Sequence, residues 1–125
     1  MSKPPLETRA LALAAAHAAG EKKATEVLVL DLRGLMAITD YFVVASVGSQ
    51  RQARAVADEV QKILRDLGEK PLRREGEAEG GWVLLDYAGF VIHVFGEEER
   101  GFYGLERLWR DAPVVDWESE LAASP

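Results

Sequence analysis

The sequence predicts a single α/β domain in which a mixed β-sheet of about five strands is flanked by helices, in the order α-β-β-α-β-β-β-α. Short apolar runs rich in β-branched residues alternate with segments whose apolar residues recur at helical spacing. Two of these runs, residues 82–87 and 90–95, are separated by only two residues, which is typical of an antiparallel hairpin. A chain of 125 residues suits one such domain.

The first part of the chain is expected to supply one helix and two strands. Residues 6–19 are dominated by Ala and Leu, which are strong helix formers, and Gly20 stands where a C-terminal cap is expected. The apolar runs 26–32 and 41–47 are typical of buried strands, and Gly34 ends the first of them.

An amphipathic helix and a weaker strand candidate follow. Ser49 is expected to cap the helix, whose apolar residues recur every three or four positions until Gly68 ends it. Residues 71–75 are the weaker strand candidate. The second strand, this helix and the third strand are expected to form a crossover between parallel strands, to which the hairpin adds antiparallel pairing.

The C-terminal region is expected to contain a last helix and a tail. Three consecutive acids open the helix, from Glu97 to about Arg110, because negative charge is favoured at a helix N-terminus, and Pro113 ends it. Residues 112–125 are expected to form an acidic, disordered tail.

Composition and charge exclude several kinds of site. The chain has no cysteine and two histidines, His17 and His93, which excludes cysteine-based clusters and multi-histidine metal sites. The net charge of -6 argues against a general nucleic-acid binder, and residues 97–120 carry -5 of it. The sequence has no membrane-spanning run and no signal-peptide pattern, so we expect a cytoplasmic protein.

An enzymatic alternative stays open. The Gly48-Ser49 turn between a strand and a helix, with Asp31 and Asp86 on nearby strands, is similar to the plan of metal-dependent nucleotidyltransferases. Such a site needs two acids that alternate on one strand, whereas Asp31 and Asp86 are single. Binding of magnesium-nucleotide would favour this alternative.

His93 is the polar residue of most interest. Alternation along the strand places it on one face with Val91 and Phe95. A lone histidine among apolar residues most often makes one local hydrogen bond. Aromatic residues are concentrated in the hairpin and the segment after it, however, and aromatic residues with arginine anchor protein interfaces. Core packing and a binding surface are therefore both open here.

Four motifs together resemble the Iojap family of ribosomal silencing factors. They are DYFVVAS at 40–46, SxRQ at 49–52, WVLLDY with VIHVF in the hairpin, and RxxYxLExLW at 100–109, in the family's order over residues 6–111. The resemblance implies a fold related to nucleotidyltransferases without their metal site, with no catalysis and no cofactor.

The resemblance also implies a partner and a contact surface. Members of this family dock on the large ribosomal subunit, on its basic ribosomal protein fourteen, and keep the small subunit from joining, which silences translation when nutrients are limiting. A role in large-subunit maturation and a homodimer are implied as well. An acidic C-terminal segment would steer a basic partner of this kind. By motif position, the contact surface would comprise Trp82, Val83, Asp86, Tyr87, His93, Phe95, Arg100 and Tyr103.

Alternation along a strand restricts this surface. Trp82 and Tyr87 stand five positions apart, so a regular strand would direct them to opposite faces. Either a twist at the hairpin brings both to the rim, or one of them belongs to the core.

Overall fold

The structure is a computed structural model that describes residues 7–76, 82–96 and 110–123. Its elements are, in chain order, α1 (Thr8–Glu21), β1 (Thr25–Asp31), β2 (Tyr41–Val47), α2 (Gln50–Asp66), β3 (Arg73–Glu75), β4 (Trp82–Asp86), β5 (Phe90–Gly96), β6 (Val114–Val115) and α5 (Trp117–Ala123). The predicted order is confirmed through β5. The helix predicted from Glu97 to Arg110 lies almost entirely outside the described residues, and Arg110 itself lies in a turn.

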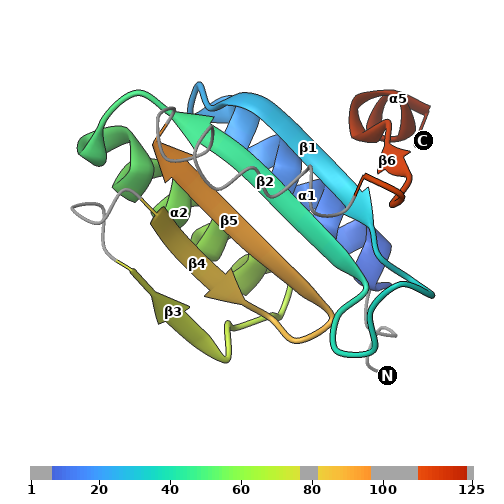
Figure 1. Ribbon diagram of the computed structural model, residues 1–125. Helices are drawn as coiled ribbons and strands as arrows, with labels where there is room; N and C mark the ends of the chain where they lie inside the picture. Colours follow the sequence, from blue (N-terminus) through green and yellow to red (C-terminus); the bar gives the residue numbers. More distant parts are fainter. Residues whose placement is uncertain (1–6, 77–81, 97–109, 124–125) are drawn as a thin grey trace.

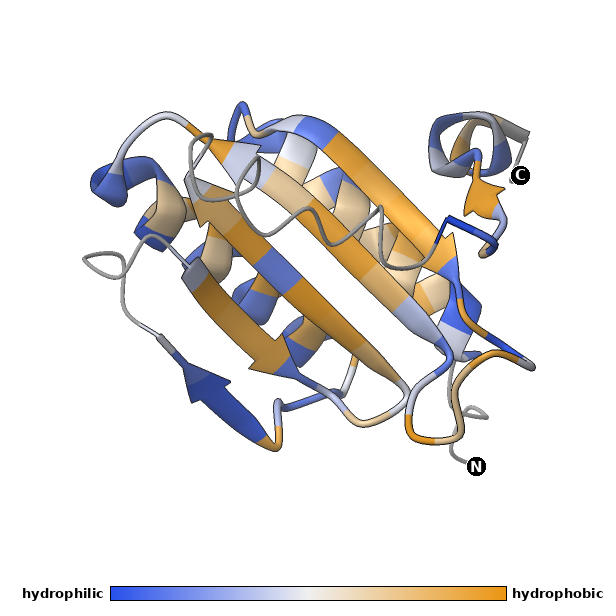
Figure 2. Cartoon of the chain, in the orientation of Figure 1, coloured by the Kyte–Doolittle hydropathy of each residue, from blue (hydrophilic) through white to orange (hydrophobic). Residues whose placement is uncertain are grey.

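The described strands form one mixed sheet in the order β3-β4-β5-β2-β1-β6 (Figure 1). The predicted hairpin is confirmed, since β4 and β5 pair antiparallel. The parallel partner of β2 is β5, however, and the expected pairing with the third strand is wrong, because β3 pairs antiparallel with β4 at the edge. The reason is polarity: β3 is short and charged, whereas β5 is apolar and suits the centre (Figure 2).

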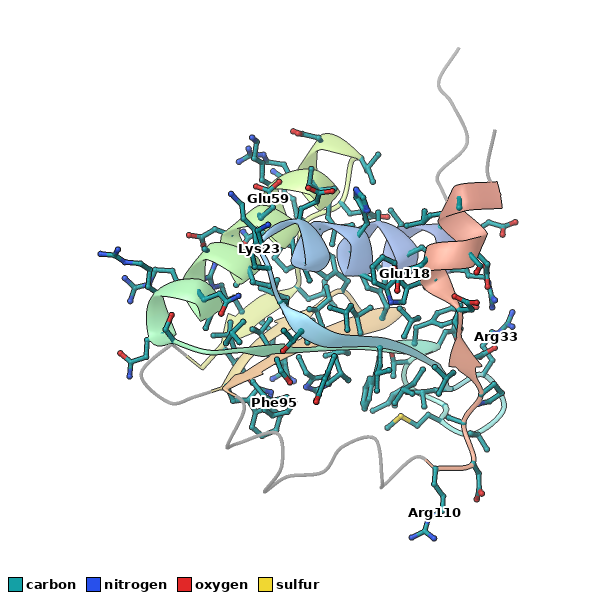
Figure 3. The ribbon with its side chains drawn as sticks, turned by 90° about the horizontal axis from the view of Figure 1, so that it is seen from above. Lys23, Arg33, Glu59, Phe95, Arg110 and Glu118 are labelled. Atoms are coloured by element: carbon teal, nitrogen blue, oxygen red, sulfur yellow. The ribbon has the colours of Figure 1, made fainter. Side chains whose placement is uncertain are left out.

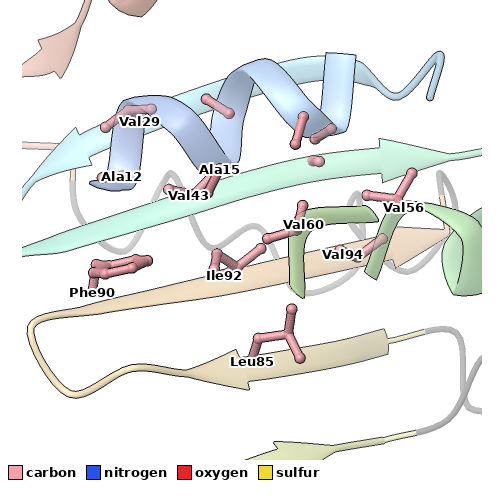
Figure 4. Close-up of a cluster of buried hydrophobic side chains, with 14 of the residues drawn as sticks. Ala12, Ala15, Val29, Val43, Val56, Val60, Leu85, Phe90, Ile92 and Val94 are labelled. Atoms are coloured by element: carbon pink, nitrogen blue, oxygen red, sulfur yellow. The ribbon is translucent and has the colours of Figure 1, made fainter. Parts of the chain in front are cut away.

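Helices α1 and α2 cover one face of the sheet, and the main core fills the space between them (Figures 3 and 4). Strand alternation supplies this core: Val43, Ile92 and Val94 are fully buried and point at the helices. Alanine-rich α1 adds small buried side chains that let it lie close to the sheet. Alternation also leaves a second set of apolar side chains on the opposite face, here called the distal face.

The helix ends agree with the sequence at α2 and differ from it at α1. Ser49 Oγ accepts a hydrogen bond from the Gln52 backbone N–H at 3.0 Å, and Gly68 adopts φ +95° just after α2, as predicted. Gly20 does not cap α1. The helix continues to Glu21, and Lys23 takes the left-handed conformation with φ 69° instead.

The disordered tail predicted from residue 112 is wrong for residues 112–123. Strand β6 pairs with β1, with Val115 opposite Val29, and adds the sixth strand. Helix α5 packs on α1, and the Trp117 indole N–H donates a hydrogen bond to the Val27 carbonyl at 3.1 Å. Acidity suggested disorder, but the two apolar anchors Val115 and Trp117 order the segment by burial and strand pairing.

Candidate functional site

The distal face carries a hollow of about 370 Å³ near the β4–β5 turn. The loop between β1 and β2, the start of β3 and the hairpin form its walls. Most of its lining is apolar, with polar groups at a few positions. The lining residues are Met36, Ile38, Thr39, Phe42, Leu72, Arg73, Leu84, Asp86, Ala88, Val91 and His93.

Large apolar side chains stand exposed around this hollow. Ile38 is 79% exposed and Leu72 is 71% exposed, and both line it. Leu35, which is 46% exposed, comes from the same loop as Ile38. Neighbouring exposed apolar residues of this size mark interaction sites more often than scattered ones do. We call Leu35, Ile38 and Leu72 the apolar rim.

An aromatic cluster lies on the distal face, and two of its members, Phe42 and His93, also line the hollow. The ring of His93 lies 4.6 Å from that of Phe42, edge to face, and 6.0 Å from that of Phe95, nearly parallel to it. The Trp82 ring lies 4.8 Å from the Phe95 ring. Figure 3 shows Phe95 on the side of the sheet away from the helices. The cluster therefore joins β2, β4 and β5 on the distal face.

The protonation state of His93 follows from its hydrogen bond. The Trp82 indole N–H donates to His93 Nδ1 at 3.2 Å, and an indole nitrogen is only a donor. Nδ1 is therefore unprotonated, and the neutral ring carries its proton on Nε2. Burial lowers the pKa of His93 from 6.5 to about 4, because the charged imidazolium loses its hydration. His93 is neutral in the folded protein near pH 7.

We expect His93 to make stability depend on pH. Between pH 6.5 and about 4 the unfolded chain binds more protons than the folded protein, so the free energy of unfolding falls as the pH is lowered. The shift corresponds to a loss of about 2 kcal/mol between pH 7 and pH 5. Urea unfolding at the two pH values measures it.

Two variants identify the source of this loss. His93→Phe removes the titrating ring, so the difference between the two pH values should shrink by most of that amount. His17→Gln removes the other histidine, which is exposed on α1, and should keep the full loss. An equal loss in His93→Phe and in the wild type would contradict the assignment.

The structure brings only part of the predicted surface together. Four of the predicted residues lie on the distal face: Trp82, Asp86, His93 and Phe95. Alternation along the strand predicted that His93 and Phe95 share a face. Asp86 accepts from Arg73 Nε at 3.2 Å and from the Ala88 backbone N–H at 2.8 Å, so it also fixes the hairpin turn. Arg100 and Tyr103 lie outside the described residues.

Val83 and Tyr87 lie on the opposite face. Val83 is 1% exposed in the core beneath the helices, so it is not available to a partner on the distal face. Tyr87 packs against the same core and stacks on Phe90 at 4.8 Å, and burial raises its pKa to about 12. Trp82 and Tyr87 therefore point to opposite faces, which is the outcome that regular alternation required.

The residues of the enzymatic alternative do not converge. Asp31 accepts two hydrogen bonds from the Arg33 guanidinium, at 2.8 and 3.0 Å, and one from the Arg33 backbone N–H at 3.0 Å. These hold its pKa below the ordinary value, and Asp31 also lies near Arg9 of α1. Asp86 lies on the distal face, with two strands between it and Asp31. The Gly48-Ser49 turn follows the far end of β2. These groups cannot share one metal ion.

Sequence reasoning missed the apolar rim and Thr39. They belong to connecting segments where apolar residues have no helical or strand period, and such residues give no pattern to recognise. The available signal was modest: the run Leu35-Met36-Ala37-Ile38 is unusually apolar for a loop.

The fold and the hollow define a class: a small mixed α/β domain with an apolar face suited to docking. No helix among the described residues is long and apolar enough to span a bilayer. Residues 5–125 match the family described as "Ribosomal silencing factor during starvation". The chain belongs to this family of ribosomal silencing factors.

Individual relatives agree with this assignment. The chain is 38% identical over 108 residues to "Ribosomal silencing factor RsfS" of Halalkalibacterium halodurans, covering 86% of this chain and 92% of that protein. A crystal structure of a Chromobacterium violaceum protein matches with a TM-score of 0.80 and 32% identity, over 83% of this chain and 87% of that one. A mouse protein named "Mitochondrial assembly of ribosomal large subunit protein 1" is 29% identical over 82% of this chain and 46% of its own length.

Proposed function

We propose that this protein binds the large ribosomal subunit through the apolar rim and the neighbouring hollow, and thereby prevents the small subunit from joining. Its contact on the subunit is the basic ribosomal protein fourteen. Inhibition is steric, so it needs no catalytic group and no cofactor. Translation is repressed while the protein is bound, under nutrient limitation in the cytoplasm, and the free protein is a homodimer.

The observation that supports this function is the exposure of large apolar side chains around a preformed hollow. Ile38 and Leu72 are more than two-thirds exposed, and they line the same hollow as His93, which accepts a hydrogen bond from the Trp82 indole. Exposed apolar groups beside buried aromatic residues are typical of the centre of a protein interface. The family assignment supports a ribosomal partner, and the name of the mouse relative supports the large subunit.

The polar groups of this face favour a protein partner over RNA. Arg73 is the one basic residue that lines the described hollow, and it is paired with Glu75 at 2.9 Å and with Asp86. Contacts to phosphate need cations that are free to neutralise it. An apolar patch with an internally paired cation is better suited to a protein surface.

Purified ribosomal subunits test the proposal. The protein should cosediment with large subunits in a sucrose gradient, and preincubation with it should reduce the formation of complete ribosomes when small subunits are added. Immobilised ribosomal protein fourteen should retain the protein by itself. Cosedimentation without an effect on joining would contradict the steric mechanism, and failure to cosediment would contradict the partner.

A further inference from the structure

The hollow contains two buried polar groups for which the fold provides no hydrogen bond. Thr39 and His93 are each 5% exposed, and both line the hollow. Thr39 Oγ1 and His93 Nε2 meet no hydrogen-bond partner among the described residues. A buried polar group without a partner destabilises a fold, so two of them at one hollow point to a missing ligand group.

Both groups can donate a hydrogen bond. The hydrogen bond from the Trp82 indole occupies His93 Nδ1 and leaves the proton on Nε2. It also fixes the orientation of the ring, which is held between Phe42 and Phe95. The Thr39 hydroxyl is a donor that rotates to suit an acceptor. The hollow therefore presents one oriented donor and one adaptable donor.

The surroundings select a neutral acceptor. Asp86 lines the same hollow and would repel a carboxylate or a phosphate. Arg73 is already paired with Asp86 at 3.2 Å, and the imidazole of His93 is uncharged near pH 7. The other lining groups are mostly apolar, so a charged ligand would lose its hydration without gaining an opposite charge.

We propose that the hollow binds amide carbonyl oxygens, from the backbone or from Asn or Gln side chains of the docked protein, and that Thr39 and His93 each donate to a separate one. This inference rests on the proposed function, which supplies the docked protein, and it specifies the chemical group that enters. Both donor atoms lie just beneath the wall of the hollow, since each exposes less than 1 Å². The side chains that cover each donor have to shift as an acceptor enters.

Thr39→Val tests the proposal because it removes the hydroxyl while keeping the shape of the side chain. Its affinity for purified large subunits should fall about tenfold, as expected for one lost hydrogen bond to a buried group. Its melting temperature should rise by about 4 °C, because the free protein no longer buries an unpaired hydroxyl. Thr39→Ser keeps the hydroxyl and is the matched control for affinity. A merely structural threonine would not change stability and binding in opposite directions.

A second measurement separates failure of the inference from failure of the proposed function. If the wild type and Thr39→Val bind the subunits equally, the inference is overturned and the proposed function stands. If the wild type does not bind them, the proposed function fails, and a titration with N,N-dimethylacetamide, an amide that only accepts, decides the inference. It should shift the His93 Nε2–H resonance in the wild type, and to a similar extent in Thr39→Val, whose His93 donor is unchanged. No shift in the wild type would overturn the inference.

Discussion

Replacing Ile38 and Leu72 together by serine is expected to weaken binding to the large subunit roughly a hundredfold or more, equivalent to about 3 kcal/mol. Both side chains are more than two-thirds exposed, so their apolar surface is available for burial only against a partner. Serine is chosen because it adds no charge, and an added acid would attract a basic partner and mask the loss. Cosedimentation across a concentration series measures the affinity.

The control for this double variant is Leu67→Ser. Leu67 is 42% exposed at the end of α2, on the helical side of the sheet, and lines no part of the hollow. It should bind as the wild type does. All three substitutions are at exposed positions, so each should change the free energy of unfolding by about 0.5 kcal/mol or less. A folded double variant with unchanged affinity would remove the apolar rim from the interface.

Trp117→Ala is expected to lower the free energy of unfolding by about 3 kcal/mol. The indole packs against the main core and holds α5 on α1, and its N–H satisfies the carbonyl of Val27, the third residue of β1. The substitution leaves a cavity between the two helices and an unpaired carbonyl. Urea unfolding followed by circular dichroism measures the loss.

Glu118→Ala is the matched control, because Glu118 lies in the same helix at an exposed position. It should unfold within about 0.5 kcal/mol of the wild type. If Trp117→Ala were as stable as this control, α5 would contribute nothing to the fold.

The folded state of residues 112–123 also decides how steering by the acidic segment can be tested. Removing residues 112–125 would remove a folded part of the sheet, so the contribution of the acidic side chains to association has to be tested by single neutralising substitutions.

The fold was largely predictable because its signals are local. The apolar runs of β2 and β5, the two-residue connection at Ala88-Gly89 and the cap at Ser49 each depend on a few neighbouring residues. The errors concern long-range pairing. Distant parts of the chain decide which strand lies parallel to β2. They also decide whether a tail with two apolar anchors packs against the sheet.

The contact surface was predictable only in part, and for the same reason. Alternation placed His93 and Phe95 on one face, and motif position selected Trp82, which the structure brings to both of them. Val83 was also selected by motif position, but the strand directs it into the core. A residue that directly follows or precedes a contact residue in a strand is expected to lie on the opposite face of the sheet.

By itself, the sequence determined the class of fold, the hairpin and the family, because periodicity, turn residues and motif spacing are properties of short stretches of chain. Only the tertiary structure decided which residues form the hollow. Thr39 and His93 are far apart in the chain, and their donors come to line one hollow only when β2 and β5 align side by side. Burial is a property of the packed assembly, so an unpaired buried group cannot be recognised before the surfaces that bury it are in place.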